Sequence, residues 1–294
     1  MPPILIHQDL EFFRAAVTFT AATTGFQARL IEKDYFCSLL LQYLAEANGS
    51  LIFKGGTCLA KVLVDFYRLS EDLDFVIPMA LDSTRTERSR QAAPMKTAID
   101  SLPQELPIFG LDKALTGANN STQYLAIVEY TSLVTGERDM IKLEIGLREP
   151  LMLPEVAGSA KTILLNPISG EPLVEKLDLR SISRLEAFAE KIRAALSRRE
   201  VAIRDFYDLD YAMRKKLFLP QDEQLIDLVR QKIRIPGNQP VSTSERRLVE
   251  LRQQVEAQLR PVLRESDFQS FDLDRTFGII SDMAARVCSA DGES

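Results

Sequence analysis

Two short motifs in the first third of the chain carry residues that could do chemistry together. The first is Gly55-Gly56-Thr57, which ends the brief apolar run 51–53 and therefore predicts a buried strand that enters a tight turn. Because glycine has no Cβ, two adjacent glycines let the backbone approach a ligand closely. Apolar residues at helical spacing follow, so we expect a helix with Thr57 at its N-cap and an anion-binding turn at its start.

Asp72 and Asp74 form the second motif. In a strand the two carboxylates would lie on one face, while Leu73 and Phe75 would lie on the other. Adjacent carboxylates repel each other, and oxygen ligands of this kind suit Mg²⁺, which commonly takes one or two carboxylates together with substrate phosphates. A phosphate-binding turn one helix away from a metal-binding pair predicts a site for a nucleoside triphosphate (NTP).

The combined pattern is similar to the GG[S/T]…DxD signature of the DNA polymerase β nucleotidyltransferase superfamily. The longer strings 53–61 and 68–74 resemble more closely the AbiEii-type nucleotidyltransferase toxins, which are the toxin halves of bacterial type IV toxin–antitoxin and abortive-infection systems. The resemblance implies that these strings bind the nucleotide through Lys54, Gly55, Gly56, Thr57, Lys61, Arg68 and Ser70. An ordinary surface lysine remains the alternative for Lys61, and a structural role remains the alternative for Arg68 and Ser70.

A third acid is expected from a neighbouring strand. Residues 124–130 and 140–146 predict two strands joined by a turn, and in the second strand apolar residues alternate with Lys142 and Glu144. The superfamily resemblance implies that the third carboxylate of a two-metal site comes from such a strand, so Glu144 is the candidate metal ligand. Lys142 shares its face and is a candidate for neutralising phosphate charge. The alternative for Glu144 is a solvent-exposed position on an amphipathic strand.

Beyond the Pro- and Gly-rich stretch 150–175, nearly all of the chain predicts helix. The string 186–196, followed by Arg204-Asp205-Phe-Tyr-Asp208-Leu209, resembles the E-K…RDxxDL motifs of AbiEii-type proteins. The resemblance makes Lys191, Asp205 and Asp208 candidate catalytic residues, and a lysine ammonium suits phosphate. Asp205 could fix Lys191 or act on the incoming hydroxyl, and Asp208 could serve equally. Residues 180–216 hold ten Lys or Arg against six Asp or Glu, which favours this stretch for RNA contact.

The remaining pattern predicts an α+β protein. We expect a polymerase β-like nucleotidyltransferase core on a mixed sheet, with N-terminal helices, over residues 1–170, and an all-helical C-terminal domain over 171–294. Within the core, residues 80–122 predict a helix at 86–101 and then a loop. A further strand is expected around 161–165.

Two other segments carry specific expectations. The charged string Glu32-Lys33-Asp34-Tyr35 recurs in AbiEii-type proteins just ahead of the glycine motif, and it predicts either a solvated helix face or a brace at the edge of the site. Ser242-Thr-Ser-Glu245 predicts a capping box for a helix over 245–259.

Composition excludes several other kinds of site. The 294 residues carry a formal charge of −6, so nonspecific nucleic-acid binding by net charge is not expected. Because the chain has a single histidine, His7, a histidine-rich zinc site is excluded, and the three cysteines have no CxxC spacing. No signal peptide and no apolar run near the roughly 20 residues of a membrane span are recognisable, so a cytoplasmic protein is expected.

The resemblance implies a reaction and its partners. An acceptor hydroxyl, by resemblance that of the 3′ end of tRNA, would attack the α-phosphate of an NTP with Mg²⁺ or Mn²⁺ bound by Asp72, Asp74 and Glu144. A cognate antitoxin, encoded next to this gene, would not need to bind the chain. The alternatives are NTP-dependent modification of a protein, either this one or the antitoxin, and a nucleotide-binding regulator without turnover.

Overall fold

The computed structural model describes residues 5–47 and 49–289, and the chain divides into two compact units. The first unit ends at Ile182 and the second begins at Ser183. Residues 177–181 form a strand of the first unit's sheet, so this unit extends past the position near residue 170 that the Pro- and Gly-rich stretch suggests.

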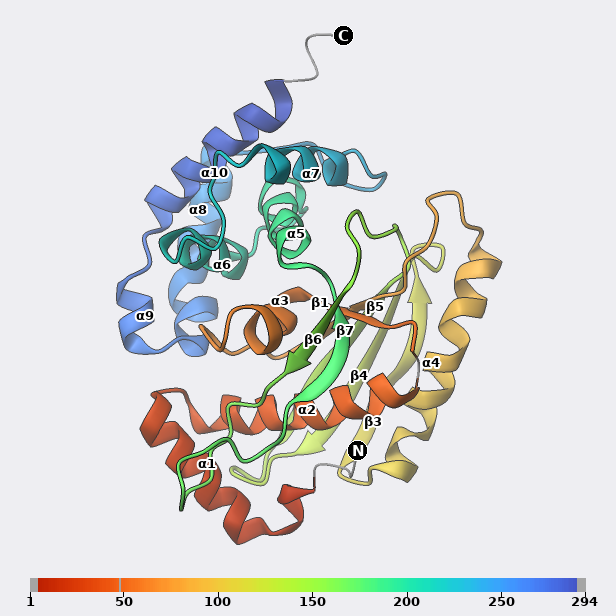
Figure 1. Ribbon diagram of the computed structural model, residues 1–294, viewed down its shortest axis with the longest axis vertical. Coiled ribbons are helices and arrows are strands. Elements are labelled where there is room, and N and C mark those ends of the chain that lie inside the picture. The colour runs from red at the N-terminus through yellow and green to blue at the C-terminus, as the bar shows by residue number, and fades with distance from the viewer. Residues whose placement is uncertain (1–4, 48, 290–294) are drawn as a thin grey trace. The chain divides into compact units, whose positions relative to one another are not determined.

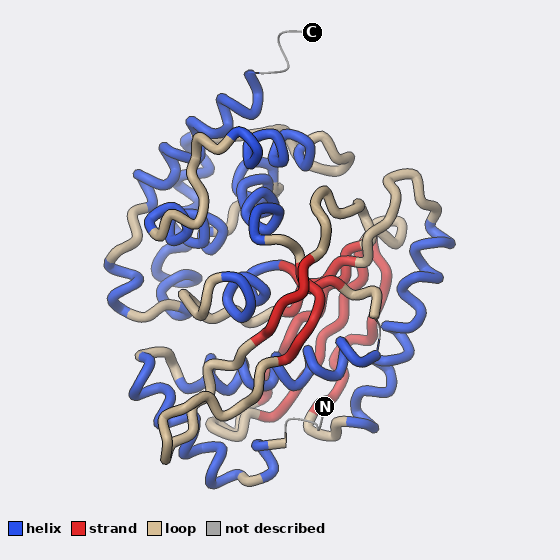
Figure 2. The backbone as a smooth tube through the Cα atoms, viewed as in Figure 1, coloured by secondary structure: helices blue, strands red, loops and turns tan. Residues whose placement is uncertain are grey.

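The first unit is built on one mixed seven-stranded sheet with the order β3-β4-β5-β2-β1-β7-β6 (Figure 2). Its strands are β1 (Ile52–Lys54), β2 (Leu73–Val76), β3 (Phe109–Ala118), β4 (Gln123–Thr131), β5 (Arg138–Gly146), β6 (Val156–Ala160) and β7 (Leu177–Ser181). The pairs β2–β5 and β1–β7 are parallel, and the other neighbours are antiparallel. The α+β class and the mixed sheet are thereby confirmed.

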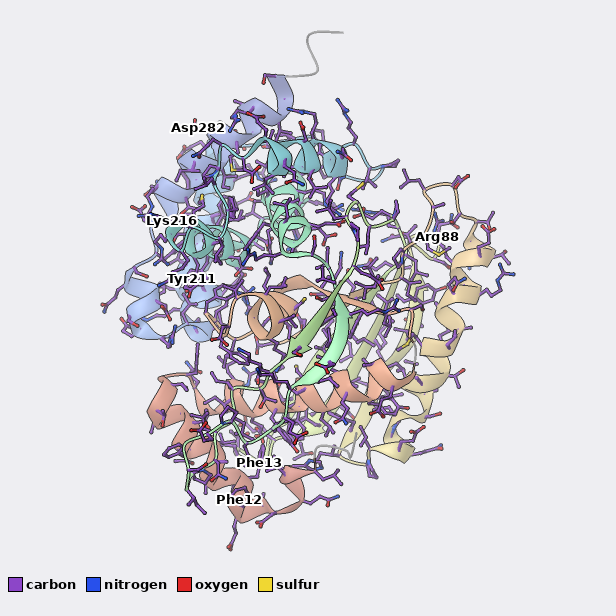
Figure 3. All side chains as sticks on the ribbon, in the orientation of Figure 1. Phe12, Phe13, Arg88, Tyr211, Lys216 and Asp282 are labelled. Carbon is purple, nitrogen blue, oxygen red and sulfur yellow. The ribbon has the colours of Figure 1, made fainter. Side chains whose placement is uncertain are left out.

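The three longest helices described in this unit pack against the sheet or against one another. They are α1 (Leu10–Thr24), α2 (Ala28–Ala47) and α4 (Arg85–Glu105), and the short η1 (Ile6–Gln8) precedes them. Gly25 ends α1 in a left-handed conformation, φ 78°, and so separates it from α2. Figure 1 shows α2 lying across one face of the sheet and α4 running beside β3. The buried Arg88, labelled in Figure 3, ties α4 to the end of β5 by donating to the carbonyl oxygen of Leu147 (3.1 Å).

The segment between β1 and β2 is helical, as expected, but its N-cap residue lies three residues before the predicted Thr57. Helix α3 (Gly55–Cys58) has Lys54 as its N-cap residue, and it continues into the π-helical turn η2 (Leu59–Leu63). Thr57 therefore lies inside the helix, and the prediction of an N-cap there was wrong. Asp72 lies directly before β2 and Asp74 lies within it.

Two predictions about strands were also wrong. Residues 109–118, expected as a loop, form β3, whose register against β4 shifts twice and so conceals the usual alternation. The strand expected at 161–165 lies at 156–160, a run of mostly small residues that gives little strand signal. Backbone N–H groups of Ile163 and Leu165 are bound instead by Asp34 and Thr20 side chains of α2 and α1, at 3.1 and 2.9 Å.

The second unit is helical throughout its described residues. Its elements are α5 (Arg184–Ser197), α6 (Ile203–Arg214), α7 (Glu223–Ile233), α8 (Glu245–Gln254), η3 (Val255–Leu259), η4 (Arg260–Val262), α9 (Glu265–Gln269) and α10 (Leu273–Ser289) (Figure 1). The helix expected at 245–259 is present, although its last turn is π-helical and Ser244, not Ser242, is the N-cap residue, with no side-chain hydrogen bond. The buried Lys232 joins α7 to α5 through Glu186 (2.7 Å) and Glu190 (3.2 Å).

None of the helices in the described part of the chain is long and apolar enough to cross a membrane.

Candidate active site

The sheet register brings three charged residues of the first unit into one row. Lys54 of β1 is opposite Asp74 of β2, and Asp74 is opposite Glu144 of β5. Directly paired residues of neighbouring strands point to the same face, so the three side chains stand side by side. The adjacent residues Phe53 and Phe75 point to the other face, where their rings lie 5.4 Å apart and line a cavity of about 310 Å³ with residues of α2.

The glycine bend lies directly against this row. Gly55 has φ 77°, a left-handed conformation that favours glycine, and a Cβ there would overlap the carboxylate of Asp74. At Gly56 a Cβ would come within 2.7 Å of the Arg68 guanidinium and 3.1 Å of the Ser70 hydroxyl. The absence of two side chains therefore lets Asp74, Arg68 and Ser70 converge on the start of α3.

Thr57 and Arg68 are both buried and hold the loop that leads to Asp72. The Thr57 hydroxyl donates a short hydrogen bond to the backbone carbonyl oxygen of Asp72. The Arg68 guanidinium donates to the carbonyl oxygen of Leu69 (3.2 Å). Thr57 thus positions the backbone that carries the first aspartate, which is a different role from the predicted helix cap.

Glu144 has a defined donor at each carboxylate oxygen. Gln123 Nε2 donates to its Oε1 (2.7 Å), and Lys142 Nζ contacts its Oε2 (3.0 Å). Burial alone would raise the pKa of Glu144, but Lys142, Gln123 and Lys54 together hold that pKa below its usual value. Burial likewise works to lower the pKa of Lys142, and its net shift is upward because of Glu144, Asp72 and Asp74. Lys142 therefore interacts electrostatically with all three predicted metal ligands.

The acidic residues around the bend supply part of the donor set that a divalent cation requires. Among residues 5–47 and 49–289, no three His, Cys, Asp or Glu side chains are grouped so that they could hold a metal ion. The pair Asp72 and Asp74 nevertheless supplies the hard oxygen donors and the number of carboxylates that Mg²⁺ commonly uses, next to a bend without Cβ atoms. The aspartate pair therefore has the donor chemistry for such a cation, whereas both oxygens of Glu144 are already engaged.

Lys61 lies away from this row. Its side chain, with only 1% of the residue exposed, reaches α2, where Nζ contacts Asp34 Oδ1 (2.6 Å) and donates to Ser38 Oγ (2.7 Å). It also donates to the backbone carbonyl oxygen of Lys161 (3.2 Å). The structure therefore gives Lys61 a place in the core and does not bring it to the glycine bend, in contrast to the expectation of a nucleotide contact.

The neighbouring charged string of α2 braces the loop before Asp72. Lys33 contacts Glu71 (3.4 Å) and Asp139 (3.1 Å), and Arg29 contacts the same two acids. Burial works to raise the pKa of Asp139, yet the Met140 N–H, Lys33 and Arg29 bring it below the usual value. Glu32, Lys33 and Asp34 are all buried, so the interpretation of a solvated helix face was wrong.

The second unit holds its own charge cluster. Lys191 of α5 contacts Asp205 and Asp208 of α6, each at 2.8 Å, and Arg198 contacts Asp205 at 3.3 Å. The Lys191 side chain is 14% exposed, whereas that of Asp208 is 1% exposed. The three predicted catalytic residues of this unit therefore come together, and both acids fix the lysine.

Gln123 is a residue of this site that the sequence did not reveal. The predicted strand began at Tyr124, one residue too late, although β4 begins at Gln123. Pairing the two predicted strands across the 132–137 turn would have placed Gln123 opposite Gly146 and near Glu144. An amide residue at a strand end gives no motif, so strand pairing was the only available signal.

The chain matches one family model and several solved structures. The family model described as "Nucleotidyl transferase AbiEii toxin, Type IV TA system" matches residues 39–277. Among solved structures, the chain is similar to MenT4, a nucleotidyltransferase toxin from Mycobacterium tuberculosis, with TM-score 0.52, 18% identity, and 94% of this chain and 99% of that chain covered. JHP933 from Helicobacter pylori matches with TM-score 0.49 and 18% identity, over 89% and 93% of the two chains. No curated protein matches the sequence significantly.

Proposed function

Because the chain belongs to the AbiEii family of nucleotidyl transferase toxins and is a nucleotidyltransferase, we propose that it transfers a nucleotidyl group from an NTP to the 3′ end of a tRNA. Membership of a type IV toxin–antitoxin family also implies an antitoxin partner. The observation that carries the proposal is the row Lys54, Asp74 and Glu144, which stands on one sheet face beside the Gly55 bend.

The proposed reaction is an in-line displacement at the α-phosphate. The acceptor oxygen forms a bond to the α-phosphorus, the bond from that phosphorus to the bridging oxygen breaks, and pyrophosphate leaves while the acceptor hydroxyl releases its proton. Catalysis of such a transfer consists mostly of positioning and electrostatic stabilisation, so a histidine base is not required.

Asp72 and Asp74 would hold a divalent cation, Mg²⁺ or Mn²⁺, with Glu144 as the adjacent third carboxylate. When bound, the cation would stabilise the negative charge that develops on the phosphate oxygens.

The side chains around the bend have distinct proposed roles. Gly55 and Gly56 let Asp74, Arg68 and Ser70 approach the start of α3, and the backbone N–H groups there are proposed to bind phosphate oxygens. Lys54 stands next to Asp74 in the row, and Lys142 is the half-exposed cation beside Glu144. Both lysines are proposed to offset phosphate charge, as point-charge ammonium groups commonly do. Lys61 is left out of this set because of its burial.

Lys191, Asp205 and Asp208 are proposed to be needed for turnover. The two aspartates fix the position of the Lys191 ammonium, whose side chain is 14% exposed, and this ammonium is proposed to meet a phosphate oxygen during the reaction. Lys191→Met should lower the transfer rate while Arg199→Met, a nearby exposed arginine of the same unit, leaves it unchanged. Equal rates for the two variants would remove this cluster from the proposal.

The basic surface at the end of α6 supports an RNA acceptor. Lys215 and Lys216 are exposed, and the cations of Arg214 and Lys215 lie 5.7 and 5.8 Å from the centre of the Tyr211 ring. Tyr211 and Lys216 are labelled in Figure 3. Lys215→Glu/Lys216→Glu should weaken tRNA binding in a salt-dependent way and leave NTP binding unchanged. A tRNA acceptor would place the reaction in the cytoplasm.

The decisive experiment uses each NTP labelled at the α-phosphate. The purified protein is incubated with total tRNA, with the antitoxin candidate encoded next to the gene, and alone, each with Mg²⁺ or Mn²⁺. Label at tRNA 3′ ends that disappears with Asp74→Asn supports the proposal. Label only in protein would establish protein modification instead. Absence of label, with Asp74→Asn as toxic as the wild type, would favour a nucleotide-binding regulator.

A further inference from the structure

The connection between β3 and β4 has an unusual backbone. Asn119, Asn120 and Ser121 follow one another with φ of 49°, 57° and 60°. L-residues visit this left-handed region mostly singly, and asparagine tolerates it better than most others. Three in succession are expected to persist only where the surroundings hold them, and such segments are frequent at functional sites.

The turn is fixed to the end of β5. Thr122 donates from both its backbone N–H (3.2 Å) and its hydroxyl (2.7 Å) to the carbonyl oxygen of Asn119. The Leu147 N–H donates in turn to the carbonyl oxygen of Thr122 (2.8 Å). These bonds set where β4 begins, and its first residue is Gln123.

From the first position of β4, the Gln123 side chain contacts the Glu144 carboxylate. Its register partner is Gly146, which has no side chain, and Glu144 lies two residues away on the same strand face. Gln123 Nε2 donates to Glu144 Oε1 (2.7 Å), while Gln123 Oε1 accepts from Asn119 Nδ2 (3.3 Å). The second bond orients the amide so that its NH₂ group faces Glu144.

Glu144 is consequently held from both sides. With Lys142 at Oε2 and Gln123 at Oε1, the carboxylate cannot turn without losing one of these contacts. Glu144 and Lys142 are both partly exposed, and ion pairs between exposed side chains contribute little to stability. Stabilisation of the fold alone therefore does not explain why Glu144 is held at both oxygens.

We propose that Gln123 is a positioning residue for nucleotidyl transfer, which holds the Glu144 carboxylate in one orientation beside Asp74, and that Asn119 orients Gln123. The inference rests on the proposed function, in which Glu144 borders the nucleotide site. It adds a side-chain relay, Asn119 to Gln123 to Glu144, that starts in the strained turn.

The first test is a double-mutant cycle. Gln123→Met keeps the length of the side chain without its hydrogen bonds, and Asn119→Gly keeps the left-handed turn without the amide. We expect Gln123→Met to lower kcat about tenfold with KM for the NTP within about twofold, and Asn119→Gly to lower kcat about threefold. The double variant should equal Gln123→Met alone, because the two residues act in series. Gln104→Met, at an exposed position of α4, is the matched control.

The second test does not depend on turnover. Binding of Mn²⁺ without NTP, followed by the electron paramagnetic resonance of the free ion, should be about threefold weaker in Gln123→Met and unchanged in Gln104→Met. Full-strength Mn²⁺ binding together with a kcat within twofold of wild type would overturn the inference. So would a loss of kcat that adds fully in the double variant.

The variants Asp74→Asn and Gln123→Met together distinguish a failure of the relay from a failure of the proposed function. If Asp74→Asn abolishes transfer while Gln123→Met does not impair it, the relay is wrong and the proposed function stands. If Asp74→Asn transfers at the wild-type rate, the proposed function itself fails.

Discussion

Lys61 and Lys142 belong to the same unit and carry the same charge, yet they occupy opposite environments. Lys61 is enclosed by α2, η2 and the segment after β6, with 1% of the residue exposed and four polar contacts. Lys142 lies on the open strand face, with 48% of its side chain exposed, beside Glu144. The buried lysine is the one closer in sequence to the glycine motif. Proximity along the chain is therefore a poor guide to which cation is available for chemistry.

In this unit, burial separates the lysine with a folding role from the lysine with a chemical role. A buried ion pair costs desolvation, and loss of one partner leaves an uncompensated charge in the core. A charge on an open face costs little to keep and can meet a ligand. We expect variants of the two regions to affect different measurements.

The largest effect is expected from the strand face. Asp74→Asn removes the central charge of the row, and the transfer rate should fall about a thousandfold, which corresponds to roughly 4 kcal/mol of transition-state stabilisation. The free energy of unfolding should change little. Label transfer and urea unfolding measure the two quantities, and Asp112→Asn on β3 is the matched control. A transfer rate within tenfold of wild type would contradict the chemical role assigned to the exposed strand face.

The second-largest effect is expected from a substitution in the core of the first unit. Lys61→Met leaves Asp34 buried without its cation and should lower the free energy of unfolding by about 3–5 kcal/mol. The double variant Lys61→Met/Asp34→Leu should recover much of this loss. Urea unfolding and NTP affinity are measured together. A stable Lys61→Met variant that has lost NTP binding would restore the earlier expectation that this lysine contacts the nucleotide.

A smaller effect is expected for Lys142→Met. The ammonium lowers the repulsion among Asp72, Asp74 and Glu144, so its removal should strengthen Mn²⁺ binding in the absence of NTP about threefold. Its contribution to stability should stay below about 1 kcal/mol, as for other exposed pairs. Lys113→Met, on β3, serves as the control. Weaker Mn²⁺ binding would show that Lys142 supports the cation site and does not compete with it.

The smallest effect is a pH dependence. The pKa of Glu144 is lower in the folded protein than in the unfolded chain, so its stabilising contribution is present above the unfolded pKa of about 4.5 and is lost as the pH falls through the folded value. Between pH 5 and pH 3, wild type should lose more stability than Glu144→Gln. Parallel stability curves, measured by urea unfolding at each pH, would contradict the assigned shift.

The sequence was sufficient where a residue's role followed from a local pattern. The glycine turn, the strand with Asp74 and the strand with Glu144 each have a periodicity or a motif, and the structure places all three together. The alternation around Glu144 identified its strand, and the register with β2 then made it a neighbour of Asp74.

The rest depended on contacts between distant segments. Lys61 can be buried because Asp34 of α2, 27 residues earlier in the chain, forms an ion pair with its ammonium. β3 was missed because its bulges break the period-two pattern, and Gln123 was missed because a strand boundary moved by one residue. Helix starts are similarly hard to predict when, as at Gly55, a glycine conformation replaces a capping side chain.

The parallel pairing of β1 with β7 has a consequence for synthesis on the ribosome. β1 ends at Lys54 and β7 begins at Leu177, so at about 5–20 residues per second the second strand emerges roughly 6–25 s after the first. During that interval the β1 edge, later covered by β7, is open to pairing with other nascent chains. The first unit can therefore complete its sheet only shortly before the helical unit begins to appear, and slow translation between residues 54 and 177 would prolong the exposure of the β1 edge.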